Sequence, residues 1–276
     1  EGIIKIPVTK DHKINTNMLE QALENAKNKG RKVFAIIGNA CSTSAGTYDD
    51  LEKLAAFSKK HNLWFHVDGA HGAAAIFSEK YKYLLKGIEK ADSVVIDGHK
   101  MLLTTGLNTM LLFKEEKKSH AAFNQKAQYL WENAGEKEWF NSSKRTFECT
   151  KQSFSIYFFI LLKMYGTEIF DEFVTRMYDL AKSFAEKIRE NEHFVLLRQP
   201  ESNIVCFRYE KPGFDILQNN KLNENIRQTI VKSGEFYLVQ TNIAEKMFLR
   251  TTLMNPKTEL KHLENLIECI RKIAES

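Results

Sequence analysis

The hydrophobic pattern in the first half of the chain alternates between helical spacing and short apolar runs. Apolar residues between Leu19 and Ala26 recur at helical spacing, and Asn17 is placed to cap that helix. Residues 33–37 form a continuous apolar run, as in a strand covered on both faces. The alternation continues with a helix over 49–60, strands over 63–67, 93–96 and 110–113, and a helix of small residues near Ala73. This order predicts an α/β fold with a mostly parallel sheet.

The second half of the chain follows a different order of elements. Its pattern predicts helices over 152–165, 170–191, 222–232 and 258–274, and strands over 194–197, 203–209, 236–240 and 246–251. Antiparallel strands with covering helices are typical of an α+β layout. We therefore expect part of a large domain over residues 1–160 and a small domain over residues 161–276.

Composition excludes several classes of protein. The chain has 276 residues, 43% of them hydrophobic, which is too apolar for a disordered protein. Its net charge of +5 is spread over scattered lysines, and its richest apolar stretch, 154–164, is shorter than the ~20 residues that a membrane span needs. We therefore expect neither a nucleic-acid partner nor a membrane partner.

The four cysteines are far apart and do not show the spacing of metal ligands or of a disulfide framework. We therefore expect no metal site. Reduced thiols, together with a sequence that shows no signal-peptide pattern, predict a cytoplasmic protein.

Two polar segments stand where predicted strands end. The first is HVDGAHG (66–72), and the second is DGHK (97–100), about one strand–helix–strand unit later. Ligands of open α/β sheets bind at the carboxyl ends of strands. Taken singly, the aspartate is most simply a helix cap and the lysine is solvated surface. Together, Asp68 and Lys100 suit pyridoxal phosphate: a lysine forms a Schiff base with the aldehyde, and an aspartate keeps the pyridine nitrogen protonated.

These segments, with GIEKADSVVIDGHKMLLTTGLNTMLLF (87–113), resemble the group II pyridoxal-phosphate-dependent amino-acid decarboxylases. The resemblance extends from near Ile4 to the last helix. The family includes decarboxylases of glutamate, aromatic amino acids, histidine, cysteine sulfinate and 2,4-diaminobutyrate. The resemblance implies fold-type I, the fold of aspartate aminotransferase, with pyridoxal 5'-phosphate as cofactor and a homodimer as the assembly.

The resemblance also implies roles for individual residues around the cofactor. Lys100 matches the Schiff-base lysine, and Asp68 matches the partner of the pyridinium nitrogen. Ala70 matches a small residue on one face of the ring, and His99 matches a histidine near the phosphate. Thr43, in a CST segment (41–43) that stands in place of the family's Gly-Thr-Thr, matches a threonine near the ring. A plain turn hydroxyl is the alternative for Thr43.

Three further matches concern the substrate. Tyr129, 29 positions beyond Lys100 (129 − 100), matches a loop tyrosine that enters the neighbouring subunit's site and protonates the substrate carbon after carbon dioxide leaves; the alternative is a packing residue on a helix. Arg250 matches an arginine that pairs with a substrate carboxylate, and the alternative is a structural ion pair. His71 replaces an aromatic residue and is expected at the mouth of the pocket, where it influences substrate choice. Lys151 and Arg208 also fall in family motifs, without an assigned role.

Two features depart from the family. Asp97 stands where many relatives have asparagine, and its carboxylate would repel a phosphate unless it points away or is neutralised. The family's phosphate loop and its ring-stacking histidine precede the position equivalent to Glu1, and the sequence shows no such stretch. We therefore expect a C-terminal portion of a larger enzyme, either one chain of a split protein that assembles with a separate N-terminal fragment or a product of proteolysis.

The leading hypothesis is decarboxylation of an L-amino acid through a Schiff base on Lys100. The segment RTTLMNP (250–256) favours a substrate like glutamate or 2,4-diaminobutyrate. Two alternatives stay open: a pyridoxal-phosphate-dependent lyase or desulfurase of the same fold, and a catalytically incomplete fragment that only dimerises.

Overall fold

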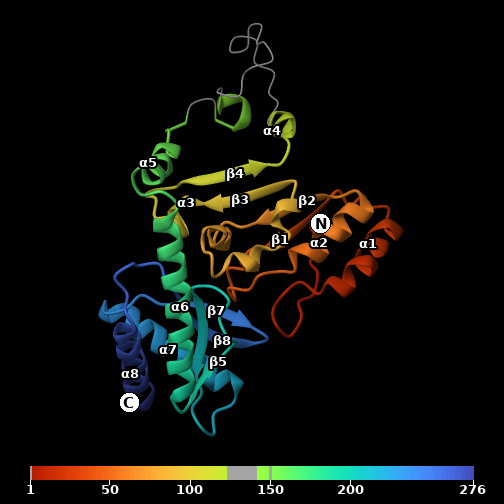
Figure 1. The fold of residues 1–276 in the computed structure, drawn as a ribbon. Helices are drawn as coiled ribbons and strands as arrows, with labels where there is room; N and C mark the ends of the chain where they lie inside the picture. Colours follow the sequence, from red (N-terminus) through yellow and green to blue (C-terminus); the bar gives the residue numbers. More distant parts are fainter. Residues whose placement is uncertain (1, 123–141, 149–150) are drawn as a thin grey trace.

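The computed structural model describes residues 2–122, 142–148 and 151–276, which build two four-stranded sheets (Figure 1). The first sheet contains β1 (Ala35–Asn39), β2 (Trp64–Asp68), β3 (Ser93–Asp97) and β4 (Thr109–Phe113), in that spatial order. The strands β1, β2 and β3 are parallel, and β4 is antiparallel to β3. The predicted α/β class with a mostly parallel sheet is therefore confirmed.

The helices of this half are short. They are α1 (Leu19–Asn28), α2 (Leu51–His61), α3 (Gly98–Met101) and α4 (Glu116–Ala122). The side chain of Asp50 accepts a hydrogen bond from the Lys53 amide (3.0 Å) and so begins α2. The helix ends at Asn62, whose φ of 51° stops further helical hydrogen bonding.

One local prediction in this half was wrong. The capping residue before α1 is Asn15, which accepts a hydrogen bond from the Asn17 amide and begins a 3-10 turn over Thr16–Met18. The predicted helix of small residues near Ala73 is present as a 3-10 helix over Gly72–Phe77. A side chain at Gly72 would collide with the Tyr48 hydroxyl and the Cys41 amide, so this turn packs too closely on its neighbours to take a larger residue there.

The second half contains an antiparallel sheet and four helices. Its strands are β5 (Phe194–Leu196), β6 (Ile204–Tyr209), β7 (Val239–Ile243) and β8 (Lys246–Thr252), in the spatial order β5-β6-β8-β7. Its helices are α5 (Ser155–Tyr165), α6 (Glu168–Glu190), α7 (Ile216–Ser233) and α8 (Leu260–Glu275). The predicted strand over 236–240 is shifted toward the C-terminus. Ala244 and Glu245, with φ of 48° and 65°, form the two-residue turn that sets the register of β7 on β8.

Helix α6 runs from the first sheet to the second (Figure 1) and contacts the 3-10 helix after β2 as well as strands β5 and β6. Its buried residues recur every three or four positions, which gives one continuous apolar face. Tyr178 in this face shares a buried hydrogen bond with Tyr48 of the first half (2.6 Å between hydroxyl oxygens). Phe184, farther along, packs edge-to-face on Phe207 of β6. One helix face therefore fixes both sheets to a common core.

Within the described ranges, no helix combines the length and the apolar character that crossing a bilayer requires.

Candidate active site

The predicted site residues gather where β1, β2 and β3 end. Asp68 at the end of β2 pairs with Asn39 of β1 and with Val95 of β3, so the three strands end at one edge. The Asp97 amide donates to the Ala70 carbonyl (3.1 Å) and joins the segment after β2 to the end of β3. The structure thus brings Asp68, Ala70 and Lys100 to one edge of the sheet.

Asp68 lies on the solvent-exposed face of β2. The alternation along the strand buries Phe65 and Val67, which leaves Asp68 on the opposite face. One oxygen of its carboxylate accepts a hydrogen bond from the Ala70 amide (3.2 Å). The other oxygen is available to a ligand at the strand end.

Lys100 lies in the short helix α3 that begins directly after β3. Its Nζ contacts Oδ2 of Asp97 at 2.8 Å, while the Thr109 hydroxyl donates to Oδ1 of the same carboxylate (2.6 Å). Partial burial by itself raises the pKa of Asp97, but the hydrogen bonds from Lys100 and Thr109 and the charge of Lys100 lower it below its ordinary value. The carboxylate is therefore ionised and paired with the Lys100 ammonium in this structure.

His99 lies beside this pair, and Thr43 lies on the loop after β1. The His99 ring is held by Asn108, whose backbone amide donates to Nδ1 (3.2 Å), and its Nε2 lies 3.8 Å from Oδ2 of Asp97. Thr43 is exposed on the loop after β1. The adjacent Ser42 shares a hydrogen bond with Thr47 (2.9 Å between hydroxyl oxygens), which closes this loop into a turn. Thr43 and His99 thus lie in segments that follow β1 and β3, the neighbours of β2.

His71 is not at the mouth of a pocket, which corrects the location expected from sequence. Its side chain is buried, with 7% of the residue exposed, and its Nε2 lies 2.7 Å from Oδ1 of Asn203. Burial lowers the pKa of His71 to about 4, and the positive charges of Lys100 and Arg250 add to this effect. The imidazole is therefore neutral at pH 7, and any influence on substrate choice stays a prediction.

Arg250 approaches the site from the second sheet. It lies on β8 opposite Cys206 of β6 and is half-buried. Its Nε is buried and has no hydrogen-bond partner among the described residues. Burial lowers the pKa of its guanidinium without discharging it. The charges of Arg250 and Lys100 both lower the pKa of His71, so both cations lie near this histidine.

The remaining predicted residues lie elsewhere. Tyr129 falls outside the described residues. Lys151 forms a surface ion pair with Glu148 (3.2 Å). Arg208 is almost fully buried in β6, where it contacts Glu210 (3.3 Å) and donates to Asn220 (3.1 Å). Arg208 is therefore part of the packing of the second sheet.

The sequence did not point to three polar residues that hold the site. Thr109 fixes Asp97, Asn108 fixes His99, and Asn203 contacts His71. Thr109 and Asn108 lie in the segment that resembles the decarboxylases, so proximity to the motif was a usable signal. Asn203 is 132 positions from His71 and carries no motif of its own.

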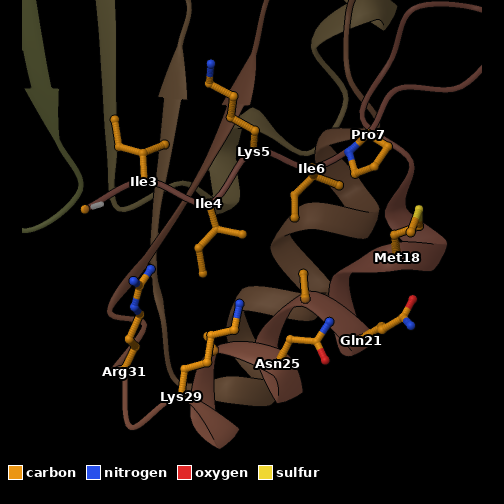
Figure 2. A pocket seen from close by; sticks show the side chains of 13 residues that line it. Ile3, Ile4, Lys5, Ile6, Pro7, Met18, Gln21, Asn25, Lys29 and Arg31 are labelled. Atoms are coloured by element: carbon orange, nitrogen blue, oxygen red, sulfur yellow. The ribbon is translucent and has the colours of Figure 1, made fainter.

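A separate groove of about 720 Å³ lies between the extended segment 2–7 and helix α1 (Figure 2). Apolar side chains such as Ile4 and Ile6 line it together with Lys29 and Arg31. None of the predicted site residues lines this groove, so the two features are distinct.

In the described parts of the chain, no three histidine, cysteine, aspartate or glutamate side chains gather closely enough to hold a metal ion.

Comparison with known proteins gives one consistent family. Residues 2–210 match the family described as the pyridoxal-dependent decarboxylase conserved domain. The chain is 24% identical over 276 residues to the L-2,4-diaminobutyrate decarboxylase of Acinetobacter baumannii, covering 100% of this chain and 54% of that protein. It is 28% identical over 266 residues to the mouse acidic amino acid decarboxylase GADL1, covering 91% of this chain and 48% of that protein.

A solved structure adds the fold. The glutamate decarboxylase domain of the diaminobutyrate-pyruvate transaminase and L-2,4-diaminobutyrate decarboxylase from Vibrio parahaemolyticus superposes with a TM-score of 0.83 at 27% identity. The alignment covers 99% of this chain and 53% of that one. The chain thus spans about half the length of the curated relatives it matches. With three quarters of its length inside the matched domain, the chain belongs to the pyridoxal-dependent decarboxylase family.

Proposed function

We propose that the protein that contains this chain decarboxylates an L-amino acid with pyridoxal 5'-phosphate as cofactor. The observation that carries the proposal is the placement of Asp68 at the end of β2 and of Lys100 directly after the adjacent parallel strand β3. A carboxylate and a primary amine at one strand edge are the donor set that this cofactor needs. The family description names the same cofactor and the same reaction class.

The residues present fit the cofactor. Asp68 keeps one carboxylate oxygen available, which suits a hydrogen bond from a pyridine N–H. Lys100 has an amine whose partner is a side chain rather than the backbone, so a rotation about its flexible stem frees it from Asp97. When bound, the cofactor supplies an aldehyde for amines and a ring that accepts electrons from the bond being broken.

Ala70, His99 and Thr43 are the proposed neighbours of the cofactor ring and phosphate. All three lie in segments that follow β1, β2 or β3, at the edge that carries Asp68 and Lys100. The Asp97 carboxylate holds the Lys100 side chain at this edge through a 2.8 Å ion pair. We infer that Lys100 exchanges this carboxylate for the cofactor on binding.

The substrate we favour is an amino acid with a second polar or charged group, such as glutamate or 2,4-diaminobutyrate. The half-buried guanidinium of Arg250 has an unfilled Nε donor, which suits a carboxylate. The names of the diaminobutyrate and acidic amino acid decarboxylases among the relatives support this class. Tyr129 is the proposed proton donor, through its phenol oxygen, to the carbon that loses carbon dioxide.

The assembly we propose is a cytoplasmic homodimer. Helix α5 has no buried residue, and its side chains Ile156, Phe159 and Ile160 are between 43% and 56% exposed. A contiguous apolar surface of this kind marks a protein–protein contact. Cys41, Cys206 and Cys269 are free thiols, which suits a reducing compartment. A boundary near residue 160 between a large and a small domain is part of the same proposal, as is an N-terminal fragment that completes the site.

The test is release of carbon dioxide from a panel of amino acids by the full-length protein supplied with pyridoxal 5'-phosphate. We expect Lys100→Ala to abolish release, and Tyr129→Phe to lower it roughly 100- to 10,000-fold by removing a general acid. Lys86→Ala is the matched control, since Lys86 forms a surface ion pair with Glu52 (3.0 Å).

Release at the unaltered rate from Lys100→Ala would overturn the proposal. Product analysis tests the alternatives at the same time. Sulfide or a deaminated product in place of the amine would indicate a lyase or desulfurase, and a lack of turnover with any amino acid would indicate a fragment that only dimerises.

A further inference from the structure

Asn203 connects the segments that carry the site residues. It directly precedes β6 and is fully buried. Its Oδ1 lies 2.7 Å from His71 Nε2, and its Nδ2 donates to the Leu253 carbonyl (2.9 Å) and contacts the Met101 sulfur (3.2 Å). One side chain therefore touches the loop after β2, the helix after β3 and the end of β8.

The orientation of this amide follows from its partners. A backbone carbonyl only accepts hydrogen bonds, so the NH₂ group of Asn203 faces Leu253 and the amide oxygen faces His71. His71 must then donate through Nε2, which fixes the tautomer with Nε2 protonated and Nδ1 carrying the lone pair. Because burial and the charges of Lys100 and Arg250 disfavour the imidazolium, the ring has one defined protonation state.

Each partner of Asn203 adjoins a residue of the proposed function. Met101 follows Lys100 directly, Leu253 lies three positions after Arg250, and His71 lies three positions after Asp68. The Leu253 amide also donates to the Asn203 carbonyl (3.0 Å), so the end of β8 is held by two hydrogen bonds. A movement of Asn203 would therefore shift the lysine, the arginine and the histidine relative to one another.

The residues beside Asn203 contact the same region. Glu201 accepts a hydrogen bond from the Tyr48 amide (3.0 Å), in the loop that carries Thr43. Gly46 in that loop packs so closely on Ser202 that a side chain there would collide with its hydroxyl. The segment 201–203 is thus packed against the loops after β1 and β2 and against α3, and Asn203 is its buried end.

We propose that Asn203 is a positioning residue of the active site, which holds His71 as the Nε2-protonated tautomer and sets Lys100 against Arg250. The proposal rests on the proposed function for its catalytic meaning, but the state of His71 is a property of the chain itself. Asn203 acts through its neighbours and has no contact with substrate in this account.

The matched control is Asn223. It is also an asparagine with no exposed surface, and it also makes three polar contacts, with the Tyr209 amide (2.9 Å), the Tyr209 carbonyl (2.7 Å) and the Asn219 carbonyl (2.8 Å). These partners all lie in the second half of the chain, away from the strand ends. Loss of either amide removes a similar set of hydrogen bonds, so the two variants separate positioning from stability.

The first readout is the imidazole nitrogen spectrum of the full-length protein, with the His71 signals assigned through His71→Gln. We expect unaltered protein to show His71 as a single Nε2–H tautomer, Asn203→Ala to show a mixture of tautomers, and Asn223→Ala to match the unaltered protein. Asn203→Asp keeps the shape of the side chain and carries the test if Asn203→Ala does not fold.

In Asn203→Asp, the new carboxylate faces Nε2. It should raise the pKa of His71 by more than one unit. The charge of Asp97 acts in the same direction, and the charges of Lys100 and Arg250 act in the opposite direction. His71 signals that are the same in the unaltered protein and in both Asn203 variants would overturn the proposal.

The second readout is the rate at which Lys100 forms a borohydride-trapped adduct with pyridoxal 5'-phosphate. Misplacement of the amine should slow this rate roughly 10- to 100-fold in Asn203→Ala, and the rate in Asn223→Ala should stay within about twofold because that site is remote. Equal slowing in the two variants would show a structural role only. If no protein forms an adduct on Lys100, the proposed function fails, while the tautomer of His71 still tests the contact with Asn203.

Discussion

The two sheets differ in how much of their apolar surface the chain itself buries. Every residue of β6 in the second sheet is buried. In the first sheet, by contrast, Ile37 of β1 is 56% exposed and Leu112 of β4 is 50% exposed. Strand β6 is therefore covered entirely by other described residues. In the first sheet, the candidate site lies at the strand ends, and the outer strands β1 and β4 keep apolar side chains exposed.

Helices α5 and α6, which lie between the two sheets in the sequence, show the same contrast. Helix α6 buries nine side chains along one face, and helix α5, directly before it, buries none. An amphipathic helix such as α6 is stabilised by the core it covers. Helix α5 packs on the core only through partly buried side chains, and the apolar side chains that it keeps exposed are typical of a contact with another surface. The difference indicates that the first sheet and α5 are the regions in which assembly changes the molecule most.

The largest effect is expected from a truncation in the second sheet. Phe207 is fully buried and contacts both Phe184 and Phe194. Phe207→Ala should lower the free energy of unfolding by about 3–5 kcal/mol, because it removes a large apolar side chain and leaves a cavity. Chemical denaturation measures this, with Phe34→Ala (76% exposed) as the control that should change stability by less than about 0.5 kcal/mol. Equal losses at the two positions would contradict the comparison.

The next effect is a pH dependence that originates in the first half. The pKa of His71 is lowered from 6.5 to about 4, so the unfolded chain binds a proton in this interval that the folded chain does not. Its contribution is fully present above pH 6.5 and is lost as the pH falls toward 4, by up to roughly 3 kcal/mol. His71→Gln should remove this part of the acid sensitivity. An unfolding free energy with the same slope between pH 6.5 and 4 in both proteins would show that His71 is not the source.

Helix caps should give equal, smaller effects in the two halves. Asp215 forms a capping box with Gln218 at the start of α7, and Asp50 caps α2. Each Asp→Ala substitution should cost about 1 kcal/mol, since both caps are local and neither depends on the surrounding core. Thermal or chemical denaturation of the two variants sharpens the comparison. A loss in one half without a loss in the other would mean that the two sheets unfold separately rather than through the shared helix α6.

The smallest effect on stability is expected at the outer apolar positions of the first sheet. Ile37→Thr should change the free energy of unfolding by less than about 0.5 kcal/mol, because most of the side chain is already in contact with water. The same substitution should reduce binding of a hydrophobic dye, measured by fluorescence, because it removes an exposed apolar side chain. A large loss of stability would instead mean that Ile37 belongs to the core.

The sequence predicts the part of the site that lies in two short continuous segments, 66–72 and 97–100. Asp68 and Lys100 each follow an apolar strand, and the rule that parallel strands end at one edge brings them together without further information. The same reasoning gives the order of strands and helices in both halves. Asp97 shows the limit of this approach, since its hydrogen bond from the Thr109 hydroxyl depends on the antiparallel pairing of β4 with β3.

The rest of the site depends on contacts between distant segments. Asn203 reaches His71 across 132 positions, and no periodicity or motif marks a single buried asparagine before a strand. For the same reason the burial of His71 was not expected: it results from packing against the second half rather than from its own neighbours. The start of β7 was misplaced because the turn at Ala244 and Glu245 contains neither glycine nor asparagine, which are the usual signals of such a turn.

The proposed function requires that Lys100 bind the cofactor covalently. Mass spectrometry of the full-length protein, after incubation with pyridoxal 5'-phosphate, reduction with borohydride and peptide mapping, measures this directly. We expect one pyridoxyl group, located on Lys100 and lost in Lys100→Ala, with Lys86 and the other surface lysines unmodified. An adduct spread over surface lysines, or one that persists in Lys100→Ala, would contradict it.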